Sequence, residues 1–129
     1  AAGLQCGITS TDYIRIGDEI LDTGDYSGPG GARIILRHPK TEVALLEVAR
    51  GGILRRGLGV NQATTVVITN VAEDHLGDYG INTLAEMVEA KFTIRQAINK
   101  QAAQIFMSYP IYNIVFQGMA ERAMTDVVQ

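Results

Sequence analysis

Three side chains that could bind a metal ion or transfer a proton stand next to apolar segments of the chain. Glu47 closes the run EVALLEVA, His75 follows the run TTVVITNVA, and Lys91 interrupts an apolar helical stripe. Taken singly, each has an ordinary explanation: a solvated strand end, a surface histidine, and a lysine whose amine reaches water from the core edge. Taken together they favour one site, because strand carboxyl ends and the following helix meet at one edge of an open α/β sheet.

These residue types suit a divalent cation. Magnesium prefers oxygen ligands and keeps several waters, which fits Glu47. The neutral ring nitrogen of His75 suits a softer ion such as manganese. The ammonium of Lys91 is useful beside a cation only when its charge is altered or is offset by a phosphate. The sequence thus predicts that Glu47, His75 and Lys91 face one cleft.

Composition is typical of a single globular domain. The 129 residues are 47% hydrophobic and 19% charged, with a formal net charge of −3, and we expect one domain over 1–129. The negative charge argues against nucleic-acid binding, and no apolar run approaches the roughly 20 residues of a membrane span. Cys6 is the single cysteine, which favours a reducing, cytoplasmic setting.

The apolar patterns predict an α/β fold, a partial parallel sheet with flanking helices. We expect, in chain order, a hairpin over 13–23, a glycine-rich loop over 23–32, strands over 33–39 and 43–48, a short helix or turn over 51–58, and a strand over 65–70. The strands over 43–48 and 65–70 should be parallel to each other and covered on both faces, because a crossover connection separates two buried apolar runs.

The clearest helix is predicted over 83–104. Thr83 and Glu86 form a capping box in which each side chain satisfies the other's main-chain amide. Apolar residues recur behind it at three- and four-residue steps as far as Ile105. Residues 111–117 could form a further strand, and residues 118–129 a terminal helix.

Two longer segments carry a family resemblance. LLEVARGGILRRGLG (45–59) and VVITNVAEDHLGDYGINTLAEMVEAK (66–91) resemble the central, ATP-binding domain of the Mur ligase superfamily, most closely the ligase half of cyanophycin synthetases. The segments GITSTDYIRIGDEI and DYSGPGGAR are similar to the sequence that follows the phosphate loop in those enzymes. The resemblance covers about residues 3–100. It implies ATP-dependent, magnesium-assisted ligation of an amino acid to a carboxylate through an acyl phosphate.

The resemblance also implies roles for individual residues. Glu47, His75 and Lys91 match the family's magnesium ligands, and His75 and Lys91 would be catalytic as well. Many members carbamylate the lysine at the position of Lys91, which turns its ammonium into an anion. Asn70 and Asp74 match the strand-end motif that positions the histidine and the nucleotide.

Further residues belong to segments that meet the substrate in the family. The segment after the phosphate loop approaches metal and substrate, and its residues here are Thr9, Ser10 and Thr11. Guanidinium groups match carboxylates, so the arginines of the 45–59 segment are candidates for holding an acidic substrate, with solvated charge as the equally weighted alternative. These are Arg50, Arg55 and Arg56.

The chain also departs from the family pattern. No Gly-Lys dipeptide occurs, so a phosphate loop is missing, and the length leaves no room for the family's carboxy-terminal domain. We therefore expect a fragment or truncated relative of an amide-bond-forming ligase, inactive as an isolated chain. Whether this chain itself binds magnesium or ATP is left open.

Two other functions remain in view, so the sequence does not decide whether the chain is an enzyme. One is a non-enzymatic α/β module that assembles with itself or with a partner and binds a small anion. The other is a divalent-metal hydrolase built on Glu47, Asp74 and His75. The hydrolase is less favoured because one histidine supplies too few nitrogen ligands.

We also expect a homo-oligomer, most simply a two-fold dimer, with no nucleic-acid or membrane partner. The run VALLEVA cannot face water in quantity, and the family's missing strand would leave an unpaired sheet edge. Apolar residues within 109–129 could cover the exposed face, so their deletion should cause aggregation or unfolding.

Overall fold

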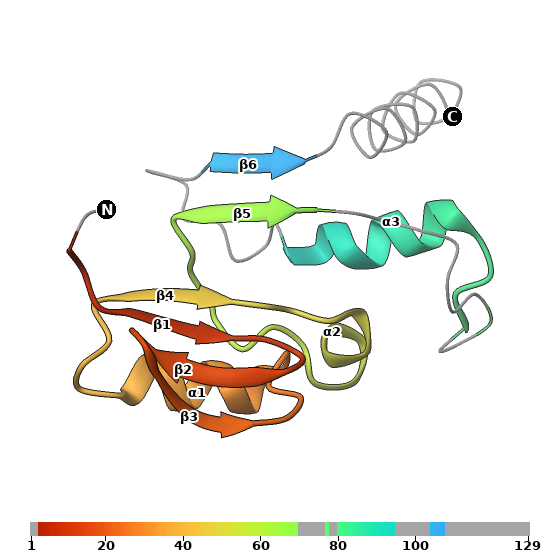
Figure 1. Ribbon diagram of the computed structural model, residues 1–129. Coiled ribbons are helices and arrows are strands. Elements are labelled where there is room, and N and C mark those ends of the chain that lie inside the picture. The colour runs from red at the N-terminus through yellow and green to blue at the C-terminus, as the bar shows by residue number, and fades with distance from the viewer. Residues whose placement is uncertain (1–2, 70–76, 78–79, 95–103, 108–129) are drawn as a thin grey trace. The chain divides into compact units, whose positions relative to one another are not determined.

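The structure is a computed structural model that describes residues 3–69, 77, 80–94 and 104–107 (Figure 1). The chain forms two compact units, Ala1–Asn61 and Gln62–Gln129.

The described part of the first unit is a mixed sheet with two helices. Its elements are β1 (Cys6–Thr9), β2 (Tyr13–Ile16), β3 (Glu19–Thr23), α1 (Pro29–Arg37), β4 (Val43–Leu46) and α2 (Arg50–Arg56). The strand order is β3-β2-β1-β4, with β2 antiparallel to both neighbours and β1 parallel to β4. The predicted hairpin over 13–23 is confirmed. Its turn uses Gly17 at φ 56°, a region that favours glycine.

Helix α1 covers one face of this sheet (Figure 1). Ile14 and Ile16 of β2 alternate toward the helix and form a buried core with Ile35. Tyr26, Ala44 and Leu46 pack against that core. Apolar area removed from water is the main stabilising contribution in such a core, and it fixes the helix on the sheet.

Strand β4 shows the same alternation, but only one of its faces is covered. Ala44 and Leu46 pack toward the core, whereas Val43 and Leu45 are 43% and 59% exposed. The prediction that the run EVALLEVA is covered on both faces therefore fails for the described residues.

The strand predicted over 33–39 is wrong, because these residues belong to α1 as far as Arg37. Pro29 stands in the first helical turn, where its missing N–H costs nothing. The buried Ala32 and Ile35 lie three residues apart, on one face of the helix. The β-branched pair at 34 and 35 suggested a strand, but packing on the sheet overrode that preference. The loop predicted over 23–32 accordingly ends at Gly28.

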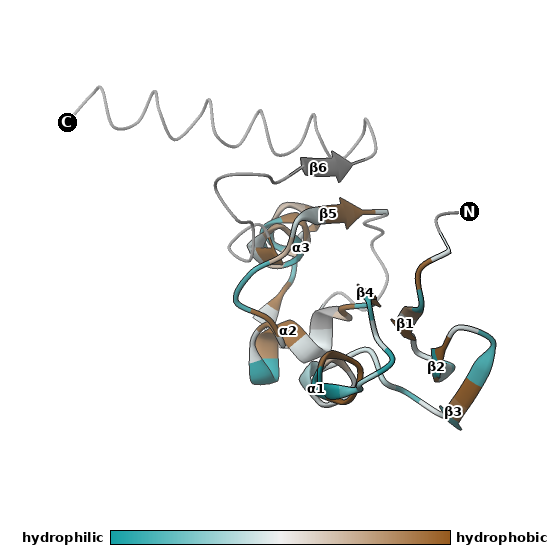
Figure 2. Cartoon of the chain, turned by 90° about the vertical axis from the view of Figure 1, so that its left-hand side faces the viewer, coloured by the Kyte–Doolittle hydropathy of each residue, from teal (hydrophilic) through white to brown (hydrophobic). Residues whose placement is uncertain are grey.

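The described part of the second unit contains β5 (Thr65–Ile68), α3 (Leu84–Phe92) and β6 (Gln104–Met107). β5 and β6 are parallel neighbours in a two-stranded sheet. Val66 and Ile68 of β5 are buried and pack against Val88 of α3, and the apolar character of β5 is visible as brown in Figure 2.

The start of the predicted helix is confirmed. The hydroxyl of Thr83 accepts from the amide of Glu86, and the Glu86 carboxylate accepts from the amide of Thr83. The prediction over 83–104 is wrong at Gln104, where β6 begins; residues 95–103 lie outside the described residues. A short apolar run such as QIFM fits a buried strand as well as a helix, so periodicity alone could not decide.

The strands predicted over 43–48 and 65–70 are confirmed as β4 and β5. They lie in different units, so their mutual parallelism stays a prediction. The strand predicted over 111–117 and the helix over 118–129 fall outside the described residues.

The fold is α/β, as predicted: a four-stranded mixed sheet with flanking helices. Across the described ranges, no helix has the length and apolar character needed to cross a bilayer.

Candidate functional site

Glu47 stands at the carboxyl end of β4, beside the carboxyl end of the parallel strand β1. The register places Thr9 opposite Leu46. The next main-chain amide, that of Glu47, donates to both the carbonyl oxygen and Oγ1 of Thr9, each at 3.2 Å. Thr9 is buried at 2% exposure. The two strand ends are thus joined at the residue that carries the carboxylate.

The Glu47 carboxylate is held by a main-chain donor. The amide of Thr11 donates to Oε2 of Glu47 at 3.2 Å, and the side chain is exposed. Among the described residues, the other oxygen, Oε1, has no hydrogen-bond partner. The described residues also include no group of three or more His, Cys, Asp or Glu side chains that could hold a metal. A single open carboxylate oxygen fits magnesium, which keeps several waters and binds phosphate oxygens.

A compact turn presents the Thr11 amide. Oγ of Ser10 accepts from the amides of Asp12 at 3.1 Å and Tyr13 at 3.0 Å, and donates to the carbonyl oxygen of Tyr13 at 3.1 Å. The amide of Ser10 donates to the same carbonyl oxygen at 2.9 Å. Serine hydroxyls commonly stabilise such turns by mimicking main-chain contacts.

The loop before α1 connects this turn to α2. Its Tyr26 amide donates to the Ser10 carbonyl oxygen at 2.8 Å, and its Ser27 carbonyl oxygen accepts from the Ala49 amide at 3.1 Å. Asp25 braces the loop by accepting the hydroxyl and the amide of Ser27 at 2.6 and 3.0 Å. These two hydrogen bonds, the hydroxyl first, lower the pKa of Asp25.

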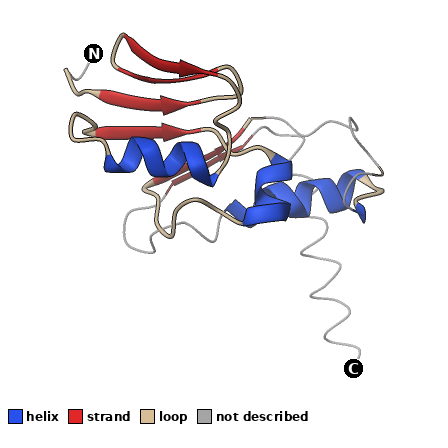
Figure 3. Ribbon diagram, turned by 90° about the horizontal axis from the view of Figure 1, so that it is seen from below, coloured by secondary structure: helices blue, strands red, loops and turns tan. Residues whose placement is uncertain are grey.

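Helix α2 lies beyond the carboxyl ends of β1 and β4 (Figures 1 and 3). It approaches the loop closely, since a Cβ at Gly52 would be in van der Waals contact with the Ser27 carbonyl oxygen at 3.4 Å. Arg50 begins the helix, and Arg55 and Arg56 occupy its exposed last turn. The short helix predicted over 51–58 is confirmed, and it puts its arginines after the strand end that bears the carboxylate.

The remaining predicted site residues are not brought together by the described structure. Lys91 is half-buried in the last turn of α3, in the second unit. Asn70, Asp74 and His75 lie outside the described residues. The convergence of Glu47, His75 and Lys91 on one cleft therefore stays a prediction.

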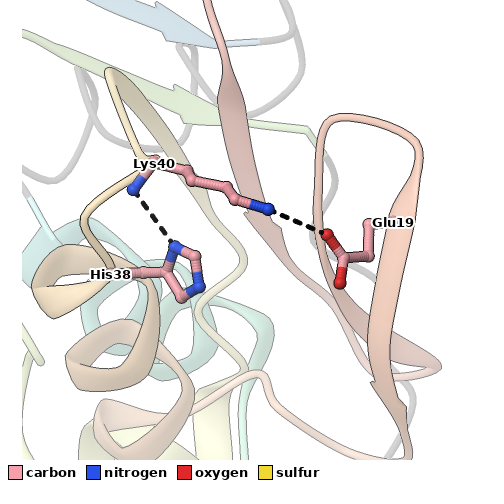
Figure 4. Close-up of polar contacts among 3 residues, drawn as sticks. All are labelled: Glu19, His38 and Lys40. Atoms are coloured by element: carbon pink, nitrogen blue, oxygen red, sulfur yellow. Dashed lines mark hydrogen bonds and ion pairs between the residues drawn. The ribbon is translucent and has the colours of Figure 1, made fainter.

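The other histidine, His38, lies at the opposite end of β4 from Glu47. Its Nδ1 accepts from the Lys40 amide at 3.3 Å, and the Lys40 Nζ lies 3.4 Å from Oε2 of Glu19 (Figure 4). Both charged side chains of this pair are more than 60% exposed, so the pair contributes little to stability. His38 is not a candidate ligand for an ion at Glu47.

Sequence reasoning missed the bracing loop. The sequence motifs give no role to Asp25, Tyr26 and Ser27, although an aspartate two residues before a serine is a signal for a side-chain-stabilised turn. Thr9, Ser10 and Thr11 were singled out by family resemblance alone, and the structure gives them specific contacts with Glu47 or with the turn that faces it.

Comparison with known proteins decides the family. The model of the Mur ligase middle domain matches residues 4–129. The chain belongs to the Mur ligase middle domain family. This match includes residues 106–129, for which the sequence motifs gave no counterpart.

Named relatives of this Mur ligase domain are ligases or synthetases. Cyanophycin synthetase of Geminocystis herdmanii is 48% identical over 97 residues, which are 75% of this chain and 11% of that protein. Cyanophycin synthetase of Trichormus variabilis is 45% identical over 96 residues, 74% of this chain and 11% of that protein.

A third relative comes from the peptidoglycan branch of the family. UDP-N-acetylmuramoyl-L-alanyl-D-glutamate--2,6-diaminopimelate ligase of Leptospira interrogans is 26% identical over 102 residues, 75% of this chain and 20% of that protein. The predicted resemblance to Mur ligases and to cyanophycin synthetase is confirmed. The chain spans about a tenth of the length of the cyanophycin synthetases it matches.

Proposed function

We propose that this chain carries the magnesium-binding edge of an ATP-dependent, amide-bond-forming ligase of the cyanophycin synthetase type. The observation that carries the proposal is the Glu47 carboxylate, anchored through Oε2 by the Thr11 amide at the carboxyl end of a parallel strand pair. This edge of an α/β sheet is where ligands bind. Family membership and 48% identity to a cyanophycin synthetase support the assignment of the chemistry.

Glu47 would hold the ion, with His75 and Lys91 as its further protein ligands. A carbamate on Lys91 would supply the negative charge that a second ion requires. When bound, ATP would supply the phosphoryl group that activates a carboxylate for ligation, and magnesium would offset the charge of its phosphates. Asn70 and Asp74 would orient the histidine and the nucleotide.

The arginines of α2 would orient the acceptor. Arg55 and Arg56 are exposed in the last turn of the helix, where guanidinium groups can reach a carboxylate, and Arg50 begins the same helix. A guanidinium that donates two parallel hydrogen bonds to one carboxylate holds it with a defined geometry. An acidic amino acid or peptide end is therefore the substrate class that these residues favour.

As an isolated polypeptide, the 129 residues should not ligate. They contain no Gly-Lys dipeptide and so lack a phosphate loop, and positioning of phosphate groups supplies most of the catalysis in phosphoryl transfer. Aspartate- or arginine-dependent ADP release by the pure chain would contradict this part of the proposal.

The metal role can be tested on the chain itself with Mn²⁺ as a paramagnetic probe. Mn²⁺ should broaden the amide NMR signals of residues 9–11 and 47, and Glu47→Gln should abolish that broadening. Glu42→Gln is the matched control, because the Glu42 carboxylate also accepts a main-chain amide, that of Gln5 at 2.7 Å, but at the other end of β4. Equal broadening in wild type and Glu47→Gln would overturn the proposal and favour a non-enzymatic module.

A further inference from the structure

Ser10 uses both its hydroxyl and its main chain to hold the turn that follows β1. Its hydroxyl accepts two amides and donates to one carbonyl oxygen, all within the turn from Ser10 to Tyr13. Its carbonyl oxygen accepts the amide of Tyr26 from the loop before α1. The turn is therefore fixed both internally and from the neighbouring loop.

Within the turn from Ser10 to Tyr13, the main-chain amide that bonds outside the turn to a distant side chain is that of Thr11. That amide donates to Oε2 of Glu47, which is 36 residues further along the chain. The main chain of Glu47 is fixed independently by Thr9, through the carbonyl oxygen and Oγ1. Thr9 thus holds the main chain of Glu47, and Thr11 holds its carboxylate.

An exposed glutamate without such a partner samples several rotamers, and ordering it costs free energy when a cation binds. The hydrogen bond from the Thr11 amide orders the Glu47 side chain before a cation binds, so this free-energy cost is smaller at binding. That hydrogen bond occupies Oε2, so that Oε1 is the oxygen presented to a ligand.

We infer that Ser10 is a positioning residue for Glu47: its hydroxyl shapes the turn that aims the Thr11 amide at the carboxylate, and the carboxylate so held is preorganised for a divalent cation. This inference rests on the proposed function for the cation, whereas the link from Ser10 to Glu47 stands on the contacts alone. Groups that orient a metal ligand typically change metal affinity about 10–100-fold when removed.

The first test needs no metal. Amide hydrogen exchange at Thr11, followed by NMR on the whole chain, should be slow in wild type and fast in Ser10→Ala and Glu47→Gln. Ser10→Thr keeps a hydroxyl and Thr11→Ala keeps the amide, so both should retain slow exchange. Slow exchange at Thr11 in a folded Ser10→Ala variant would overturn the link between Ser10 and Glu47.

The second test measures the apparent Mn²⁺ affinity from the same paramagnetic broadening. Ser10→Ala should weaken binding about tenfold or more, and Ser10→Thr should restore it. If Ser10→Ala does not fold, Thr11→Pro removes the donor directly at a turn position that tolerates proline, and should cause the same loss.

The outcomes separate the two claims. Loss of binding in Glu47→Gln together with wild-type affinity in Ser10→Ala and Thr11→Pro overturns the positioning role alone. Binding that is unaffected by Glu47→Gln, or absent from the wild-type chain, overturns the proposed metal role, and the exchange rates then still decide whether Ser10 holds Glu47.

Discussion

Thr9 and Glu47 are joined twice across the ends of two parallel strands, since the Glu47 amide donates to the carbonyl oxygen and to Oγ1 of Thr9, each at 3.2 Å. The hydroxyl of Thr9 is buried, so water cannot replace the lost contact if it is removed. This pair fixes where β4 ends and the segment leading to α2 begins.

Thr9→Val should therefore lower the free energy of unfolding by about 1 kcal/mol, the usual net value of one hydrogen bond. The effect should stay small because the Thr9 carbonyl oxygen still accepts the Glu47 amide. Urea denaturation followed by circular dichroism measures it. An unchanged unfolding midpoint would show that the hydroxyl contact contributes nothing to stability.

Thr41 provides the opposite case. Its Oγ1 is buried and has no hydrogen-bond partner within the described part of the chain. Replacing an unsatisfied hydroxyl by a methyl group removes a desolvation cost, so Thr41→Val should raise the free energy of unfolding by about 1 kcal/mol. The same urea series checks it. A loss of stability comparable to that of Thr9→Val would mean that the Thr41 hydroxyl does have a partner.

Two adjacent glycines of α1 should respond oppositely to alanine. A Cβ at Gly31 would lie 2.2 Å from the carbonyl oxygen of Tyr26, whereas a Cβ at Gly30 would meet nothing within 4 Å. Gly31→Ala should destabilise by about 1–3 kcal/mol through overpacking. Gly30→Ala should stabilise by about 0.4–1 kcal/mol, because alanine has less backbone freedom than glycine to lose on folding. Thermal unfolding distinguishes them, and equal shifts for both would contradict the packing described here.

Helix α1 also shows where prediction from sequence stopped. Strand ends and the cap of α3 could be predicted, because alternation of apolar residues and the Thr83–Glu86 pair are local patterns. The helical state of residues 33–37 could not, since two isoleucines in succession favour a strand. What decides it is the packing of Ile35 against Ile14 and Ile16 of the sheet.

The candidate site also combines features that the sequence predicts with a contact that it does not. Glu47, His75 and Lys91 could be picked out from their places at strand ends and on a helical stripe, and the family resemblance added the roles predicted for them. The Thr11 amide that holds Glu47 could not be predicted, because a main-chain donor leaves no trace in residue type and its direction depends on the turn around Ser10.

The capping box of α3 should make the helix sensitive to acid. The amides of Asn82 and Thr83 donate to the Glu86 carboxylate at 2.8 and 3.0 Å and, with Asn82 first, lower its pKa below the ordinary value of 4.5. A lowered pKa in the folded state means that this stabilisation is present above pH 4.5 and is lost as the pH falls through the lowered pKa.

NMR titration of the Glu86 side-chain carboxyl carbon should give a midpoint below 4.5 in wild type. Thr83→Ala should move that midpoint upward, because it removes the hydroxyl that completes the box. A wild-type midpoint at or above 4.5 would show that the two amides do not hold the carboxylate in solution.

The open face and edge of β4 should drive self-association. β4 has a strand neighbour on one side only among the described residues, namely β1. Its Leu45 is 59% exposed. An unpaired edge that also presents apolar side chains is a ready surface for a second copy, and closed two-fold symmetry is the common way to cover it. We therefore expect light scattering to report a homo-oligomer, and Leu45→Lys to shift it toward a monomer. Leu36→Lys is the control, because Leu36 is similarly exposed at 51% but lies on α1. A monomeric wild-type chain, or an equal response to both lysines, would show that the β4 surface is not where copies of this chain meet.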